Sequence, residues 1–152
     1  MKRRPVGEPN ADLLRWSWGM GQSSNANEFD DPTTDADYGV CLYAGTAGNE
    51  TLVYDAGIPA SSSLWRARSR GFVYTDRLRA ERGASRISVK SDASMRSAFD
   101  VRANGARLAP QVFPLATPVT AQLVHFGNGA CWESRFESGD VRATNLNEFK
   151  AR

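Results

Sequence analysis

The chain has 152 residues, of which 41% are hydrophobic and 10% aromatic, a composition typical of one folded globular domain. The net charge is +2, but residues 66–107 carry a net +7 and residues 1–65 a net −5, so the middle third predicts a basic surface. Two cysteines exclude an all-cysteine zinc site and a disulfide-dense miniprotein, and no apolar run reaches the roughly 18 residues of a membrane span.

Short runs of alternating apolar and polar residues, separated by turn-forming residues, predict about nine strands. In chain order the runs are LLRWSW, DYGVCLYAG, ETLVYDAG, SLWRAR, GFVYTD, SRISVKS, SAFDVRA, PVTAQLVHF and ACWESRF. In the first run Leu14, Trp16 and Trp18 share one face. Without long helical windows, the sequence predicts an all-β fold. We expect an antiparallel β-sandwich, Ig-like or jelly-roll-like, of about eight or nine strands, with a closed barrel as the alternative.

The remaining segments predict the limits of the domain. Residues 1–12 are polar and contain prolines, so we expect a flexible segment before a single domain over residues 13–152. This start has a positive end but no apolar stretch behind it, so no signal peptide is visible. Three prolines in residues 108–118 predict an extended segment across the core, not a central strand. The tail predicts a short edge strand through Leu146 and Phe149.

The stretch HFGNGACWESRF concentrates rare residues around a turn signal. A two-residue loop of Asn128 and Gly129 would place His125 opposite Trp132, whereas a three-residue loop would place it opposite Cys131. The apolar alternation favours the first register, because it puts both apolar rows on one face. A nucleophile and base made by Cys131 and His125 is then disfavoured, since the two side chains point to opposite faces.

The two cysteines predict a disulfide more strongly than a metal site. By the alternation of their strands, Cys41 and Cys131 both point away from the core, and they would meet if those strands were neighbours. The bond would close a loop of about 90 residues and contribute about 4–5 kcal/mol; two free thiols are the alternative. A zinc site that added His125 would still need a fourth ligand.

An acidic cluster resembles a calcium site in composition only. Its spacing lacks the turn glycine and the closing glutamate of the helix–loop–helix calcium motif, and turn capping by aspartate is the simpler interpretation. The weak calcium candidates are Asp30, Asp31, Asp35 and Asp37.

A basic stripe is the candidate ligand surface. Arg66, Arg68 and Arg70 recur at period two, so a strand would place them on one face, and Tyr43 and Tyr54 are the candidate exposed aromatics. Nucleic acid is disfavoured as a ligand, because the neighbouring Trp65 would lie on the opposite face of the strand from the arginines and could not stack on bases there. The expected partners are a surface polysaccharide, another protein, or a second copy through an edge strand.

Seven segments carry a resemblance to a known kind of domain: RWSWG, FDDPTTDADYGVCLYAG, WRARSRGFVYTD, ARLAP, PVTAQLV, CWESRF and NEFKAR. Their order resembles a recurring β-rich domain of unassigned function in bacterial secreted and surface proteins, over about residues 14–152. The resemblance implies a β-sandwich and a secreted or cell-surface location, and it brings no catalytic residue.

The expected function is therefore a non-catalytic extracytoplasmic module for binding, attachment or assembly. A carbohydrate-binding module that uses exposed aromatics is one alternative, and an enzyme of unknown class is another. Phosphate-binding loop, dinucleotide and Gly-x-Ser-x-Gly signatures are all missing from the sequence, so neither catalysis nor a cofactor is expected.

Overall fold

The computed structural model describes residues 1–2, 12–19, 24, 26–92, 97–108 and 113–152. Strands dominate this part of the chain, together with two short 3-10 helices, Ala26–Phe29 and Ser138–Asp140. The strands are β1 (Leu13–Gly19), β2 (Tyr38–Ala44), β3 (Thr51–Ile58), β4 (Trp65–Arg68), β5 (Gly71–Thr75), β6 (Ala84–Lys90), β7 (Ala98–Asn104), β8 (Val119–His125), β9 (Cys131–Phe136), β10 (Val141–Asn145) and β11 (Glu148–Ala151).

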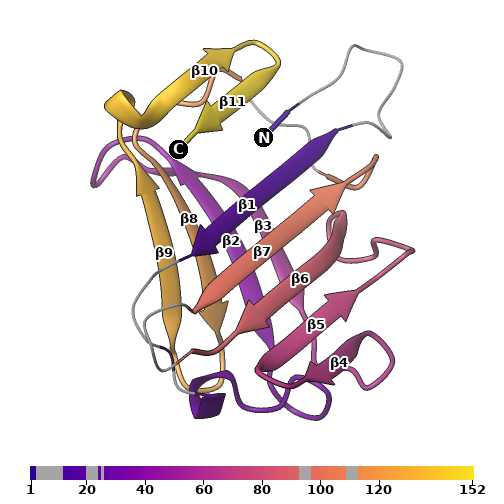
Figure 1. Ribbon diagram of the computed structural model, residues 1–152. Helices are drawn as coiled ribbons and strands as arrows, with labels where there is room; N and C mark the ends of the chain where they lie inside the picture. The colour runs from indigo at the N-terminus through magenta and orange to yellow at the C-terminus, as the bar shows by residue number, and fades with distance from the viewer. Residues whose placement is uncertain (3–11, 20–23, 25, 93–96, 109–112) are drawn as a thin grey trace.

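The strands form two main antiparallel sheets that face each other (Figure 1). One sheet has five strands in the order β1-β7-β6-β5-β4, and the other has four in the order β3-β2-β8-β9. A third, two-stranded sheet, β10-β11, lies over one end of the sandwich. Both main sheets keep open edges, so the predicted β-sandwich is confirmed and the closed barrel is not formed.

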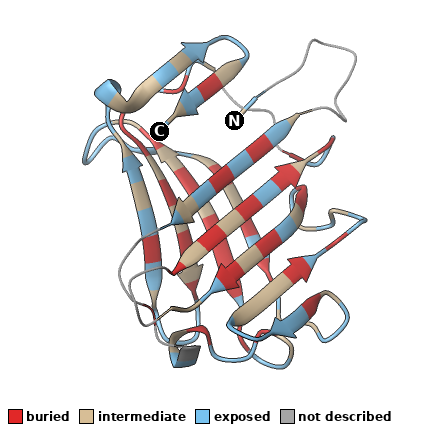
Figure 2. Cartoon of the chain, viewed as in Figure 1, coloured by how far each residue is buried: buried red, intermediate tan, exposed pale blue. Residues whose placement is uncertain are grey.

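Alternating burial along the strands builds the core (Figure 2). Leu14 and Trp16 are buried and Trp18 is half-buried, as the alternation predicts. Two aromatic clusters lie within this core. In one, Trp65 of β4 lies between Tyr38 of β2 and Tyr74 of β5, with ring centroids 5.5 and 5.4 Å apart. The other joins four rings from distant segments: Trp18, Phe29, Phe99 and Trp132.

The predicted tail strand is only partly correct. Phe149 is buried on β11, but Leu146 lies in the turn after β10 and is 71% exposed. β10 and β11 pair with each other in a hairpin, because the Asn145 carboxamide closes the turn by accepting a hydrogen bond from the Asn147 amide at 2.9 Å. The tail is therefore a hairpin and not an added edge strand.

The chain start is held against this hairpin. The Met1 ammonium donates to the Phe149 carbonyl at 2.7 Å, and Lys2 forms bridges to Leu13 and Glu148. Met1 and Lys2 are thus not loose, and the rest of the predicted flexible segment, residues 3–11, lies outside the described residues.

The proline-containing segment reaches the core at both of its ends. Leu108 and Leu115 are buried, and Phe113 packs against the core while half-buried. Phe113 and Leu115 thus contact the core as expected, whereas residues 109–112 lie outside the described residues. Val112, which we also expected there, lies outside the described residues.

Gly71 gives a sharp test of the pairing between β5 and β6. Its φ is +150°, and a Cβ at this position would overlap the carbonyl oxygen of Val89. We expect Gly71→Ala to lower the free energy of unfolding by about 1–3 kcal/mol in urea denaturation. Gly57→Ala on β3 is the control, because a Cβ there meets no atom within 4 Å. Equal denaturation midpoints for the two variants would contradict the tight pairing at Gly71.

Candidate functional site

The β8–β9 hairpin has a four-residue loop instead of the predicted two-residue loop. Leu123 pairs with Trp132, the His125 amide donates to the Ala130 carbonyl at 2.8 Å, and residues 126–129 form the turn. The predicted pairing of His125 with Trp132 is therefore wrong by two residues. Because side chains alternate with period two, this shift preserves the faces, and His125 and Trp132 are both buried as expected.

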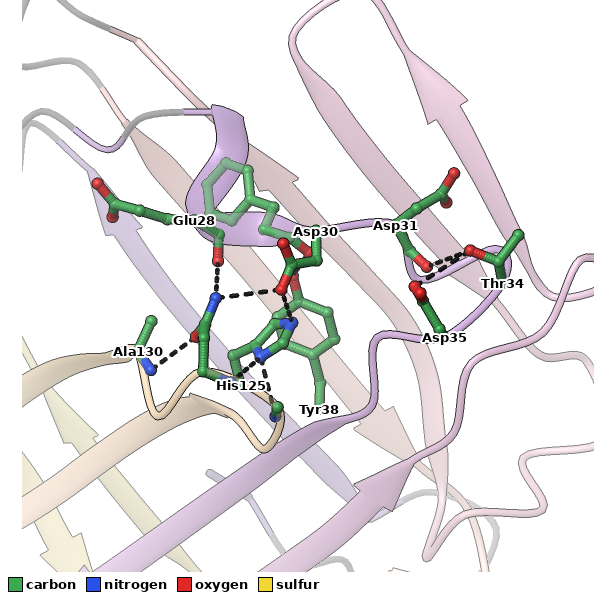
Figure 3. Close-up of polar contacts among 11 residues, drawn as sticks. Glu28, Asp30, Asp31, Thr34, Asp35, Tyr38, His125 and Ala130 are labelled. Carbon is green, nitrogen blue, oxygen red and sulfur yellow. Dashed lines mark hydrogen bonds and ion pairs between the residues drawn. The ribbon is translucent and has the colours of Figure 1, made fainter.

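The His125 imidazole holds the loop in shape (Figure 3). Its side chain is 1% exposed, and Nδ1 accepts hydrogen bonds from the amides of Gly127 and Asn128, both at 3.1 Å. A ring nitrogen that accepts must be unprotonated, so the neutral ring carries its proton on Nε2, which lies 3.4 Å from Asp30 Oδ2. Cys131 is exposed, on the opposite side of the sheet, so the structure brings no Cys–His pair together here.

The predicted disulfide is not formed. Cys41 and Cys131 are free, because β8 lies between their strands: Cys41 pairs with Gln122, and Val124 pairs with Cys131. Strands two positions apart are separated by about 10 Å, beyond the Cα separation of about 7 Å that a disulfide can span. Partial burial raises the pKa of both thiols, which makes them weaker nucleophiles and metal ligands.

The acidic cluster stabilises separate turns. Asp31 Oδ1 accepts from the Thr33 amide at 2.8 Å, and Asp37 Oδ1 accepts from the Ala60 amide at 2.7 Å. Asp30 points to the imidazole of His125, away from Asp31 and Asp35 (Figure 3). Within the described ranges, no three metal-ligating side chains come together, so the calcium candidates form no common site.

The prediction that Tyr54 is an exposed aromatic is wrong. Tyr54 is 1% exposed, since it pairs with the buried Leu42 on the inner face of the four-stranded sheet. Tyr43 is half-buried on the outer side of this sheet. All four tryptophans and all four tyrosines are buried or half-buried, so the exposed tryptophan or tyrosine that the alternative carbohydrate-binding module requires is not among them, and Phe126 is the exposed aromatic, at 61%.

A cavity of about 710 Å³ opens between β1, β9 and the β10–β11 hairpin. Its inner wall is apolar, with Leu14, Leu42 and Phe149 among the lining residues. Trp16 crosses between the sheets here and donates from Nε1 to the Ser134 hydroxyl at 3.1 Å. The lining contains neither histidine nor cysteine, and its polar side chains include Ser17, Ser134 and Glu148.

The outer surface of the five-stranded sheet gathers cations from four of its strands. Arg15 of β1 pairs with Arg102 of β7, and Arg102 pairs with Arg86 of β6, so three arginines form one row across neighbouring strands. All the outward cations of this sheet are exposed. We call them the basic face: Arg15, Arg66, Arg68, Arg86, Lys90 and Arg102.

A β-bulge in β6 turns Arg86 outward. Ala84 and Arg86 pair with consecutive residues of β7, which leaves Ser85 as the extra residue, and the Ser85 hydroxyl donates to the Arg102 carbonyl at 3.1 Å. In a regular strand Arg86 would share the parity of Ala84, which is buried. The bulge therefore lets Ala84 face the core while Arg86 joins the arginine row.

One carboxylate lies within the basic face. Asp100 accepts hydrogen bonds from Arg102 Nε at 2.8 Å, from the Ser17 hydroxyl at 2.9 Å and from Arg15 Nη2 at 3.4 Å. Partial burial acts to raise the pKa of the Asp100 carboxyl, but these hydrogen bonds and positive charges outweigh it, so the pKa is lowered. Asp100 thus remains ionised and orients two of the three arginines in the row.

The charge of this face is not balanced locally. Six cations against the one carboxylate give it a charge of +5, whereas the whole chain carries +2. Among the residues that the structure describes, Arg86 has no ion-pair partner. Like charges opposite each other on a sheet are destabilising, so an anion bound here would relieve repulsion.

The predicted arginine stripe forms only one border of this surface. Arg66 and Arg68 are exposed on the edge strand β4, but Arg70 lies in the next turn, where its Nη1 is 3.2 Å from Asp92 Oδ2. Sequence reasoning missed Arg15, Arg86, Lys90 and Arg102 as members. The excess charge of residues 66–107 was the signal for Arg86, whereas Arg15 joins only through the pairing of β1 with β7.

The fold and this surface together define an all-β sandwich with one strongly cationic sheet. Comparisons with protein-family models, with curated proteins and with solved structures found no match. The resemblance to a secreted β-rich domain therefore stays an expectation from the sequence. No helix in the described part of the chain has the length and apolar character of a membrane span.

Proposed function

We propose that this protein is a non-catalytic, extracytoplasmic β-sandwich module that binds a polyanion on its basic face. The observation that carries the proposal is the row of Arg15, Arg102 and Arg86, three like charges on adjacent strands with one carboxylate in the next row. Arginine guanidinium groups bind carboxylate, sulfate and phosphate groups through two parallel hydrogen bonds. The location rests on the resemblance to secreted domains.

The proposal of a binding module, and not an enzyme, is supported by where the reactive side chains lie. His125 is buried beneath its loop with Asp30 beside it, both thiols are on the other sheet, and Asp31 and Asp37 accept hydrogen bonds from backbone amides. The basic face presents charged and hydroxyl side chains on evenly spaced strands. This arrangement suits recognition of a ligand with repeating units.

Polyanion binding tests the proposal directly. At low salt, the protein should bind at least one of dextran sulfate, polyglutamate and single-stranded DNA, and the affinity should fall steeply as salt is added. We expect Arg86→Thr to weaken binding about fivefold, because a cation at a charged surface contributes roughly 1 kcal/mol. Isothermal titration calorimetry across a salt series measures both effects.

Arg135→Thr is the matched control for Arg86→Thr. Arg135 lies on β9 of the opposite sheet, is comparably exposed, and its Nε is 2.7 Å from Glu137 Oε1. The two variants have the same net charge, so only the place of the lost charge differs. Equal weakening by both variants, or no binding of any polyanion at low salt, would refute the basic face as the site.

A further inference from the structure

We infer that the polyanion is a linear acidic polysaccharide with a carboxylate or sulfate on successive sugars, lying across the strands along the arginine row. This inference rests on the proposed function and names the class of ligand for the same site. The ligand class is inferred from two features of the basic face: the side chains that lie between its cations, and the spacing of the cations.

The spacing of the row fits such a chain. Neighbouring strands lie about 4.8 Å apart, so the row from Arg15 to Arg86 spans about 10 Å with Arg102 in the middle. One strand spacing is close to the length that a pyranose ring adds to an extended polysaccharide. A chain that crosses the strands can therefore present one anionic group to each arginine in turn.

Hydroxyl groups complete this surface. Ser17 and Ser88 occupy the next outward row, on either side of Asp100, and Thr75 continues the arginine row onto β5. Ser88 and Thr75 can both donate and accept hydrogen bonds, as the hydroxyl groups of a sugar require, and the Ser17 hydroxyl, which donates to Asp100, can still accept. The pattern of guanidinium groups interleaved with hydroxyls matches a ligand that carries charges and hydroxyls together.

Single-stranded nucleic acid fits the same surface poorly. Its binding sites combine a basic groove with aromatic side chains on which the bases stack, worth about 1–3 kcal/mol per base. The outward positions of β1, β4, β5, β6 and β7 hold no aromatic residue. Trp65 and Tyr74 of the same sheet are buried in the core, and Trp18 and Phe72 pack against it from the inner side.

A membrane or a protein partner would need apolar anchors that this surface lacks. Leu13, at the end of the edge strand β1, is 40% exposed, whereas Val73 and Ala98 are half-buried between polar neighbours. Protein interfaces concentrate their binding energy in apolar and aromatic anchors, and peripheral membrane proteins bury apolar side chains in the lipid. Charge and hydroxyl groups are what the basic face presents instead.

Four probes of matched charge test the class of ligand: an oligogalacturonate, a single-stranded oligothymidylate, an oligoglutamate, and vesicles that contain phosphatidylserine. Titration calorimetry at near-physiological salt should give an affinity for the oligogalacturonate about tenfold above that for each other probe. Arg102→Thr and Arg86→Thr should each weaken oligogalacturonate binding several-fold, and Arg135→Thr should leave it unchanged.

The outcomes separate this inference from the proposed function. Equal or tighter binding of the oligothymidylate, the oligoglutamate or the vesicles would overturn the polysaccharide assignment but leave a polyanion-binding face. An oligogalacturonate affinity that is unchanged by Arg102→Thr would also overturn it, because the ligand would then lie elsewhere. Failure of every polyanion at low salt would refute the proposed function itself.

Discussion

Replacement of Trp65 by alanine is expected to lower the free energy of unfolding by about 3–5 kcal/mol, the largest effect of any substitution considered for this chain. Trp65 is 1% exposed, its ring contacts Tyr38 of the opposite sheet and Tyr74 of its own, and its Nε1 donates to the Pro59 carbonyl at 3.2 Å. Its removal leaves a cavity between the sheets and an unpaired carbonyl. Chemical denaturation followed by circular dichroism gives the change.

Trp65→Phe separates packing from hydrogen bonding in this experiment. Phenylalanine keeps an aromatic ring between Tyr38 and Tyr74 but cannot donate to Pro59, so we expect it to recover more than half of the loss. A Trp65→Ala variant within about 1 kcal/mol of the parent protein would mean that the two sheets are not joined through this side chain.

Replacement of His125 by alanine is the second large effect, with an expected loss of about 2–4 kcal/mol. Alanine removes a fully buried ring that stacks edge-on against Tyr38 at 5.0 Å, and it leaves the amides of Gly127 and Asn128 without their acceptor. Thermal or urea unfolding measures the loss. Loop amide hydrogen exchange should accelerate in parallel.

His125→Asn tests whether the acceptor atom matters more than the ring. The asparagine Oδ1 takes a position similar to Nδ1, so it can accept from the same two amides. We expect the asparagine variant to be clearly more stable than the alanine variant, and its loop amides to exchange hydrogen more slowly than those of the alanine variant. If asparagine is no better than alanine, the loop does not depend on that acceptor.

Local patterns in the sequence predict the strands well because burial on a sheet has a simple period. The alternation in β1 and β2 identifies the buried rows directly, and the polar connections between runs mark the turns. The β8–β9 hairpin shows the limit. The alternation of side chains predicts which residues of the hairpin face the core. The length of the loop depends on the two backbone hydrogen bonds that His125 Nδ1 accepts, and the turn signal GNG does not contain this tertiary detail.

The order of strands in space is the information that the sequence lacks. The disulfide prediction failed because β8 lies between the strands of Cys41 and Cys131, although both parities were correct. The basic face was foreseen only as an excess of charge and, at its border, as the two β4 arginines, Arg66 and Arg68. Its arginine row needs the long-range pairing of β1 with β7 and the bulge at Ser85, and neither leaves a local pattern.

The uneven charge of the sandwich also affects how the molecule meets a partner in solution. Since the basic face carries +5 and the chain +2, all other residues together carry −3, so the excess positive charge is concentrated on the outer surface of the five-stranded sheet. A field of this shape turns the molecule before contact, so that an anionic surface meets the five-stranded sheet first. If a polyanion binds the basic face as proposed, its approach is guided in orientation, and the four-stranded sheet, with its two thiols, faces away from the ligand.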